Sequence, residues 1–156
     1  MAEKYVFDAN EFINLQRRQP IDVYPVVWDT IGALVDKGII VSSREVYDEL
    51  LEGKDQLSDW AKQRKECFVS SEVPVQKCVR EILQEHRGLV EGGKKKNTAD
   101  PFIIALAKIN RCTVVTEETP TKSPVAPKIP DVCAAYGIRN IDFVTFLREQ
   151  NISFSK

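Results

Sequence analysis

The stretch KYVFDANEFI, residues 4–13, places an acid between a short apolar strand and a helix. Residues 4–8 have the apolar and aromatic character of a strand, and Phe12 and Ile13 begin a helical pattern. Asp8 therefore lies where the strand ends. Two explanations fit an acid at this point: a cap for the free amides of the helix, or the first ligand of a metal site.

Strands and helices are predicted to alternate along the rest of the chain. Further strands are expected at 39–42, 67–69 and 112–116, and helices near 26–38, 42–51, 57–66, 73–88, 97–110, 131–137 and 142–150. The strands are continuously apolar, as in a parallel sheet covered on both faces. The sequence thus predicts a three-layer α/β/α domain with a central parallel sheet.

Local signals mark several boundaries of these elements. Gly38 is a helix terminator, and Pro101 is expected in the first turn of its helix. Ser42 precedes Glu45 by three residues, the spacing of a capping box. The stretch GLVEGGKKKN, residues 88–97, is predicted as a loop, and about 119–130 as a stiff proline-rich insertion.

Composition indicates a single globular domain over residues 1–156. Hydrophobic residues make up 43% and charged residues 29%, and no stretch approaches the roughly 18 apolar residues of a membrane span. We therefore expect a cytoplasmic protein. The net charge of −1 does not favour nucleic acid, so phosphate binding would need local positive charge. The candidates are Arg17 with Arg18, Lys94 to Lys96, and Lys122 with Lys128. Taken alone, however, the stretch KKKN after GG is more simply interpreted as a solvated loop.

Cysteine and histidine chemistry is not indicated. The four cysteines, Cys67, Cys78, Cys112 and Cys133, form no CxxC pair and lie in apolar contexts, so buried free thiols are expected. His86 is the only histidine. Neither a phosphate-binding glycine loop nor a GxSxG nucleophile motif is present, which argues against dinucleotide, P-loop and serine-hydrolase chemistry.

Acids that are far apart in the sequence are predicted to meet at one edge of the sheet. Asp8 closes the first strand, Thr116, Glu117 and Glu118 close the strand at 112–116, Glu49 lies on the helix after 39–42, and Asp100 opens a helix. In open parallel sheets the ligand crevice lies outside the carboxyl ends of the strands. The sequence therefore indicates a carboxylate cluster there.

Such a cluster needs protons or a cation. Two carboxylates 4 Å apart repel by about 4 kcal/mol at an effective dielectric near 20. Oxygen ligands favour Mg²⁺ or Mn²⁺ over zinc. Taken singly, however, Asp8 and Asp100 are also explained as acids at helix starts, and Glu49 and Glu118 as surface acids.

Four segments resemble the motifs of PIN-domain nucleases, in the order of that family and over residues 5–118. They are FDANEFI with Asp8 and Asn10, VYDELL with Glu49, TADPFIIALA with Asp100, and VVTEE with Thr116 and Glu118. The resemblance is closest to PIN-like proteins that carry a tail like KIPDVC and are related to VapC-type toxins of toxin–antitoxin modules.

The resemblance implies an Mg²⁺- or Mn²⁺-dependent endoribonuclease acting on single-stranded RNA. It implies Asp8, Asp100 and Glu118 as metal ligands and Glu49 as a ligand or a water-orienting acid. Asn10 and Thr116 would be hydrogen-bond partners of the ligands. It also suggests an antitoxin partner and a homodimer.

Two departures from the family pattern leave alternatives open. A glutamate stands where the fourth motif usually has aspartate, and the neighbouring Glu117 is a second candidate for the same role. Asp131, after the proline-rich insertion, either returns to the site or caps a helix. A PIN-fold module that binds RNA or protein without catalysis is the alternative function, and a phosphatase or DNA nuclease is a third.

Overall fold

The computed structural model describes residues 3–91 and 99–154, and its centre is a five-stranded parallel sheet. The strands are β1 (Tyr5–Phe7), β2 (Ile40–Ser43), β3 (Phe68–Val69), β4 (Thr113–Val115) and β5 (Asn140–Ile141). Their order across the sheet is β3-β2-β1-β4-β5, and each neighbouring pair is parallel. β1 is therefore central, and its carboxyl end lies beside those of β2 and β4.

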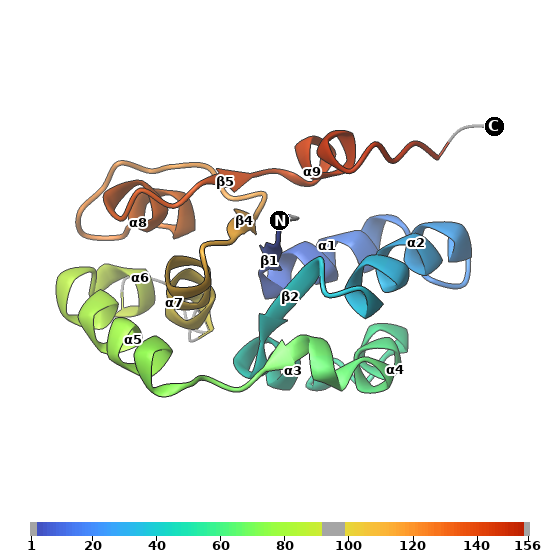
Figure 1. The fold of residues 1–156 in the computed structure, drawn as a ribbon, viewed down its shortest axis with the longest axis horizontal. Helices are drawn as coiled ribbons and strands as arrows, with labels where there is room; N and C mark the ends of the chain where they lie inside the picture. Colours follow the sequence, from blue (N-terminus) through green and yellow to red (C-terminus); the bar gives the residue numbers. More distant parts are fainter. Residues whose placement is uncertain (1–2, 92–98, 155–156) are drawn as a thin grey trace.

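Helices cover both faces of this sheet, as Figure 1 shows. They are α1 (Ala9–Arg18), α2 (Pro25–Asp36), α3 (Arg44–Leu51), α4 (Gln56–Gln63), a 3₁₀ turn η1 (Lys65–Cys67), α5 (Val73–Glu85), α6 (Gly88–Glu91), α7 (Asp100–Asn110), α8 (Ile129–Ala135) and α9 (Phe143–Glu149). α7 packs against β1, β2 and β4 and carries α5 on its outer side, while α1 to α4 lie across the sheet from α7. The predicted three-layer α/β/α architecture is confirmed.

Two elements were not predicted from the sequence. β5 has only two residues, both half-buried, and its pairing partner β4 lies 26 positions earlier, so no local apolar run marks it. The start of the predicted loop at 88–97 is instead α6, whose Leu89 is 1% exposed and packs into the core. Lys94 to Lys96 lie outside the described residues.

The predicted capping box at Ser42 is wrong. The residue that caps α3 is Ser43, whose side chain accepts a hydrogen bond from the Val46 N–H at 3.3 Å. Ser42 still belongs to β2, and its hydroxyl donates to the Phe7 carbonyl of β1 at 2.7 Å. The hydroxyl satisfies a buried carbonyl at the end of β1, which a helix cap at this position could not do.

An aromatic cluster fixes the junction between β1 and α1. The Phe7 ring lies 5.3 Å from that of Phe12 and 5.1 Å from that of Phe146, and all three side chains are fully buried. Burying aromatic rings of this size provides much of the stability of a small core. Because Phe7 and Phe12 flank Asp8, the backbone at Asp8 is held by the core.

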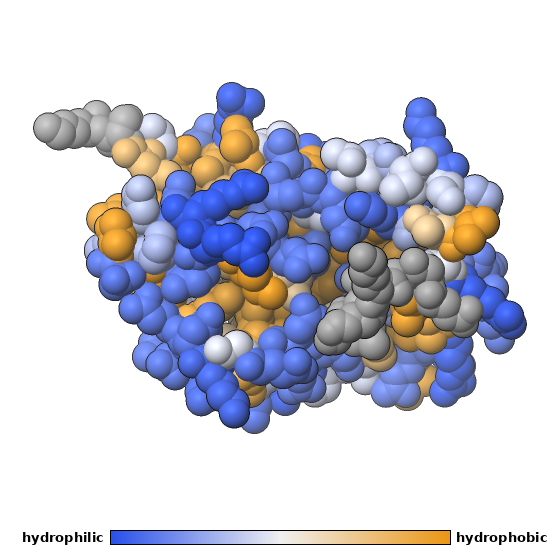
Figure 2. Space-filling model, turned by 180° about the vertical axis from the view of Figure 1, so that it is seen from behind, coloured by the Kyte–Doolittle hydropathy of each residue, from blue (hydrophilic) through white to orange (hydrophobic). Residues whose placement is uncertain are grey.

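The cysteines are buried and the visible surface is mostly hydrophilic, as expected for a globular domain of this composition. All four cysteines are buried free thiols, as predicted. On the face seen in Figure 2, hydrophilic side chains cover most of the surface, with smaller hydrophobic areas between them. Within the described ranges, no helix is long and apolar enough to cross a membrane.

Candidate active site

Four acids lie on the segments that follow the carboxyl ends of the central strands or that pack beside them. Asp8 directly follows β1, Glu49 lies on α3 after β2, Asp100 is the first residue of α7, and Glu118 comes three residues after β4. Parallel strands bring these ends to the same edge of the sheet. The charges of Glu49 and Glu118 raise the pKa values of both Asp8 and Asp100, as described below, so the four acids share one electrostatic environment.

Asp8 is the most deeply buried of these acids, with 2% of its surface exposed. Its Oδ1 accepts the Glu11 N–H at 2.6 Å and caps α1, while its Oδ2 accepts the Thr116 hydroxyl at 2.9 Å. Burial raises the pKa of Asp8 to about 7 against the opposing effect of these two bonds, and the carboxylates of Glu118 and Glu49 add to the rise. Asp8 is thus a helix cap and a member of the acid cluster at once.

Asp100 differs from Asp8 because no hydrogen bond among the described residues acts to lower its pKa. It opens α7 without a side-chain capping bond, and no hydrogen bond to its carboxyl group is present among residues 3–91 and 99–154. Burial is the largest cause that raises its pKa to about 8, followed by the carboxylates of Glu118, Asp8 and Glu49. A carboxyl group with this environment is half protonated near pH 8 and has a strong preference for a nearby positive charge.

The three residues after β4 point to different partners. Thr116 is 3% exposed, donates to Asp8, and accepts the Glu118 N–H at 3.2 Å. The Oε1 of Glu118 accepts the Ile129 N–H at 3.0 Å. Glu117 is exposed and accepts the Phe143 N–H at the start of α9 at 2.8 Å. Of the two glutamates, Glu118 is the one whose charge raises the pKa of both Asp8 and Asp100.

Glu49 and Asn10 differ in their relation to the cluster. Glu49 is half-buried, and its carboxylate contributes to the raised pKa values of Asp8 and Asp100. Asn10 is exposed, and its side chain makes no hydrogen bond in the part of the chain that the structure describes. The structure therefore brings Glu49 to the acids but does not connect Asn10 to them.

Asp131 is engaged with the proline-rich loop. Its carboxylate accepts the N–H groups of Lys128 at 2.8 Å, Lys122 at 2.9 Å and Thr121 at 3.1 Å, and the Thr121 hydroxyl at 3.0 Å. Burial acts to raise the pKa of Asp131, but these bonds outweigh it and lower the pKa to about 2. Of the two alternatives for Asp131, the contacts are those of a cap for α8 and its preceding loop.

Glu11 is a residue that the sequence analysis missed. It lies in the first turn of α1, is 3% exposed, and has one carboxyl oxygen, Oε1, that is buried without a hydrogen-bond partner among the described residues. Burial raises its pKa to about 9, with further contributions from Glu117 and Asp8 and a hydrogen bond to Glu117. The spacing Asp8 to Glu11 is that of a capping box and was a usable signal, although its glutamate is here turned toward Glu117.

The acids fit a hard divalent ion in donor type and charge but not in their present positions. Carboxylate oxygens are the ligands that Mg²⁺ and Mn²⁺ prefer, and an ion would offset the repulsion that raises the pKa values of Asp8 and Asp100. Yet within residues 3–91 and 99–154 no three His, Cys, Asp or Glu side chains are arranged to hold one metal ion. Ion binding would therefore require some of these side chains to rotate.

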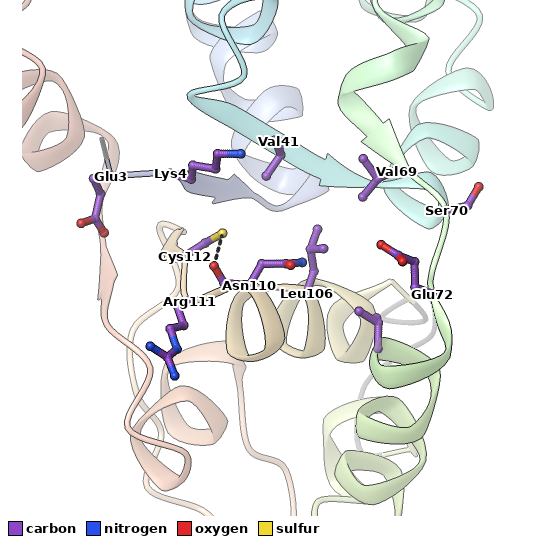
Figure 3. A pocket seen from close by; sticks show the side chains of 11 residues that line it. Glu3, Lys4, Val41, Val69, Ser70, Glu72, Leu106, Asn110, Arg111 and Cys112 are labelled. Carbon is purple, nitrogen blue, oxygen red and sulfur yellow. Dashed lines mark hydrogen bonds between the residues drawn. The ribbon is translucent and has the colours of Figure 1, made fainter. Parts of the chain in front are cut away.

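A cavity of about 640 Å³ lies elsewhere, between the sheet and α7 (Figure 3). Val41, Val69 and Leu106 line its apolar part, and Lys4 and Glu72 lie toward its ends. None of the clustered acids lines it. The candidate active site is thus distinct from this cavity and is defined by its carboxylates.

Solved structures share this fold over almost their whole length. A chain of VapBC2 from Rickettsia felis, bound to a DNA fragment from their promoter, is 16% identical with a TM-score of 0.54, covering 89% of this chain and 98% of that one. A chain of FitAB bound to an IR36 DNA fragment is 18% identical with a TM-score of 0.56, covering 88% and 94%. FitAcB from Neisseria gonorrhoeae is 17% identical with a TM-score of 0.51, covering 88% and 96%.

These likenesses establish a PIN-like fold for the chain, and at such low identities they establish the fold alone. Residues 5–154 match a family described as "Domain of unknown function (DUF4411)", and the chain belongs to that family. No match is found among curated proteins.

Proposed function

We propose that this protein is a metal-dependent endoribonuclease and the toxin of a toxin–antitoxin pair. The observation that carries the proposal is the group of carboxylates at the carboxyl ends of a PIN-like sheet, where buried Asp8 and half-buried Asp100 both have pKa values raised by Glu118 and Glu49. A structural role alone gives no reason to hold half-buried Asp100 among other carboxylates, since no hydrogen bond to its carboxyl group is found in the part of the chain that the structure describes.

Asp8, Asp100 and Glu118 are the proposed ligands of Mg²⁺ or Mn²⁺, with Glu49 as a ligand or a water-orienting acid. When bound, such an ion lowers the pKa of a coordinated water and stabilises a leaving oxygen of the phosphodiester. Thr116 holds Asp8 in place by its hydrogen bond, and the Ile129 N–H holds Glu118. Glu117 is directed to α9 and Glu11, which favours Glu118 as the ligand.

The test is cleavage of single-stranded RNA by the purified protein with Mg²⁺ or Mn²⁺. We expect cleavage that EDTA stops and that Asp8→Asn and Asp100→Asn abolish. Asp48→Asn is the matched control because Asp48 is an exposed acid on the same helix as Glu49. Glu118→Gln should remove activity and Glu117→Gln should leave most of it. Equal cleavage by wild type, Asp8→Asn and Asp100→Asn would indicate a contaminating nuclease and refute the proposal.

An antitoxin partner and a homodimer belong to the same proposal. VapBC2 and FitAB, which share the fold, are complexes in their solved structures. A neighbouring gene for a small DNA-binding protein, and co-purification of its product with this chain, would support the pair. We also propose that the protein acts in the cytoplasm, where its RNA substrate is found.

A second candidate is a PIN-fold module that binds RNA or protein without catalysis. The observation in its favour is that no three described acids surround a common point that could hold an ion. It predicts RNA or protein binding with no turnover. It also predicts that Mn²⁺ does not raise the melting temperature, whereas the nuclease proposal predicts a rise that Asp100→Asn removes.

A further inference from the structure

The proline-rich loop, residues 119–128, both leaves and rejoins the chain at the candidate active site. It begins directly after Glu118, and it ends at Ile129, whose N–H donates to Glu118 Oε1 at 3.0 Å. Glu118, one of the proposed metal ligands, thus joins the beginning of the loop to its end. A shift of Ile129 would therefore disturb the hydrogen bond that holds Glu118.

Asp131 gives this loop a defined shape. Its carboxylate gathers the N–H groups of Thr121 and Lys122 from one limb and that of Lys128 from the other. Further bonds stiffen the turn between them: Thr121 Oγ1 accepts the Ser123 N–H at 3.2 Å, and Ser123 Oγ accepts the Ala126 N–H at 3.3 Å. Because both limbs bind one carboxylate, the backbones of Lys122 and Lys128 lie close together.

The tip of the loop is docked on α6. A Cβ atom added at Gly88, the first residue of α6, would lie 1.8 Å from the Val125 carbonyl oxygen. Only glycine permits so close an approach. The loop is therefore held at three places, by Glu118, by Asp131 and by Gly88. These contacts fix the backbone positions of its lysines.

Both lysines of the loop are available to bind an anion. Lys122 and Lys128 are exposed, and neither forms an ion pair within the described residues. The loop that carries them ends at Ile129, which donates to Glu118 of the acid cluster, and negative charge in that cluster would repel an approaching phosphodiester. Because the net charge of the chain is −1, attraction for RNA has to come from such local positive charge.

We propose that the proline-rich loop is a substrate-positioning element in which Lys122 and Lys128 bind backbone phosphates of single-stranded RNA beside the acid cluster. Asp131 is a positioning residue that holds the two lysines together. The proposal rests on the proposed function, since it names how the same site receives its substrate. Lysine is suited to this role as a compact charge on a flexible stem, which follows a backbone without reading bases.

The experiment measures binding of a short fluorescein-labelled single-stranded RNA of mixed sequence at several salt concentrations. All proteins carry Asp100→Asn so that the RNA stays intact. Each phosphate contact to a single strand contributes about 0.7 to the slope of log K against log salt, so Lys122→Ala with Lys128→Ala should lower the slope by about 1.4. Lys37→Ala with Lys62→Ala is the control, because it removes the same charge from exposed sites on α2's end and α4.

Asp131→Ala separates positioning from simple electrostatics. Removing an acid beside two lysines should tighten RNA binding if only net charge matters, whereas loss of the loop frame should weaken binding and lower the slope. Circular dichroism and the melting temperature identify a variant that has unfolded. In that event, Thr121→Val, which removes the hydroxyl bonds to Asp131 and Ser123 but keeps the two backbone amides that donate to Asp131, gives the same test with a smaller expected loss.

The outcomes for the loop and for the nuclease are distinguishable. Metal-dependent cleavage by wild type, together with equal salt slopes for the two double-lysine variants, would overturn the loop proposal and leave the proposed function standing. A reduced slope only for the loop variant, without cleavage by wild type, would support the loop as an RNA-binding element and refute the nuclease. Absence of both RNA binding and cleavage would overturn both.

Discussion

Replacing Asp100 by asparagine should stabilise the protein in the absence of divalent ions while abolishing cleavage. Burial and the neighbouring carboxylates raise the pKa of Asp100 from 3.8 to about 8. An acid whose pKa is raised by folding binds its proton more tightly in the folded state, so stability is highest below the unfolded value and is lost as the pH rises toward 8. Asparagine has nearly the same shape and carries no charge at any pH.

The size of the effect follows from the shift. At pH 7 a pKa change from 3.8 to about 8 corresponds to about 4 kcal/mol of destabilisation, and the aspartate recovers up to about 1 kcal/mol from its place at the start of α7. We expect Asp100→Asn to raise the free energy of unfolding by roughly 2–3 kcal/mol at pH 7 in EDTA. The gain should fall below about 1 kcal/mol at pH 4, where the carboxyl is protonated in the folded state and only about half ionised in the unfolded state.

Urea unfolding, followed by circular dichroism at pH 4, 5, 6 and 7, measures this difference. Asp48→Asn is again the control, because an exposed acid should give no comparable gain. Mn²⁺ at about 100 times its dissociation constant should add about 2.7 kcal/mol to the wild type and little to Asp100→Asn. A variant that is less stable than the wild type in EDTA at pH 7, or a difference that does not change with pH, would refute the reasoning.

Three further predictions concern the surroundings of the site. Glu11→Gln should raise the free energy of unfolding by up to about 3 kcal/mol at pH 7, because burial first, and then the charge of Glu117, raises the pKa of Glu11 from 4.5 to about 9. Urea unfolding measures this gain, and its absence would contradict a buried charge at Glu11. Gly88→Ala should lower the free energy of unfolding by about 1–3 kcal/mol and expose the proline-rich loop to proteases, because the added methyl group would overlap the Val125 carbonyl. An unchanged rate of proteolysis would contradict the contact between this loop and α6. The stabilising contribution of Asp131 should be present above its ordinary pKa of 3.8 and disappear as the pH falls through about 2, so the advantage of wild type over Asp131→Asn should shrink over that range; a constant advantage would exclude the charge as its source.

The sequence was sufficient for the architecture because the relevant signals are local. Continuous apolar strands separated by helical periods predicted the parallel sheet, and they also predicted that Asp8 follows a strand and that Asp100 opens a helix. β5 escaped because a two-residue strand has no pattern of its own and depends on pairing with β4. The cap of α3 is Ser43 rather than the predicted Ser42, because the Ser42 hydroxyl donates to the distant Phe7 carbonyl, a contact that no local pattern marks.

The directions of the site's side chains were decided only by tertiary structure. Neighbouring residues such as Glu117 and Glu118 have similar local surroundings in the sequence, yet one contacts α9 and the other contacts α8. The bond from Thr116 to Asp8 joins residues 108 positions apart. Sequence alone determined that Asp8 follows a strand and that Asp100 opens a helix, because the ends of strands and helices are encoded within a few residues. Their burial, their partners and their raised pKa values come from elements distant in the chain, because desolvation and mutual repulsion arise only when those elements pack together.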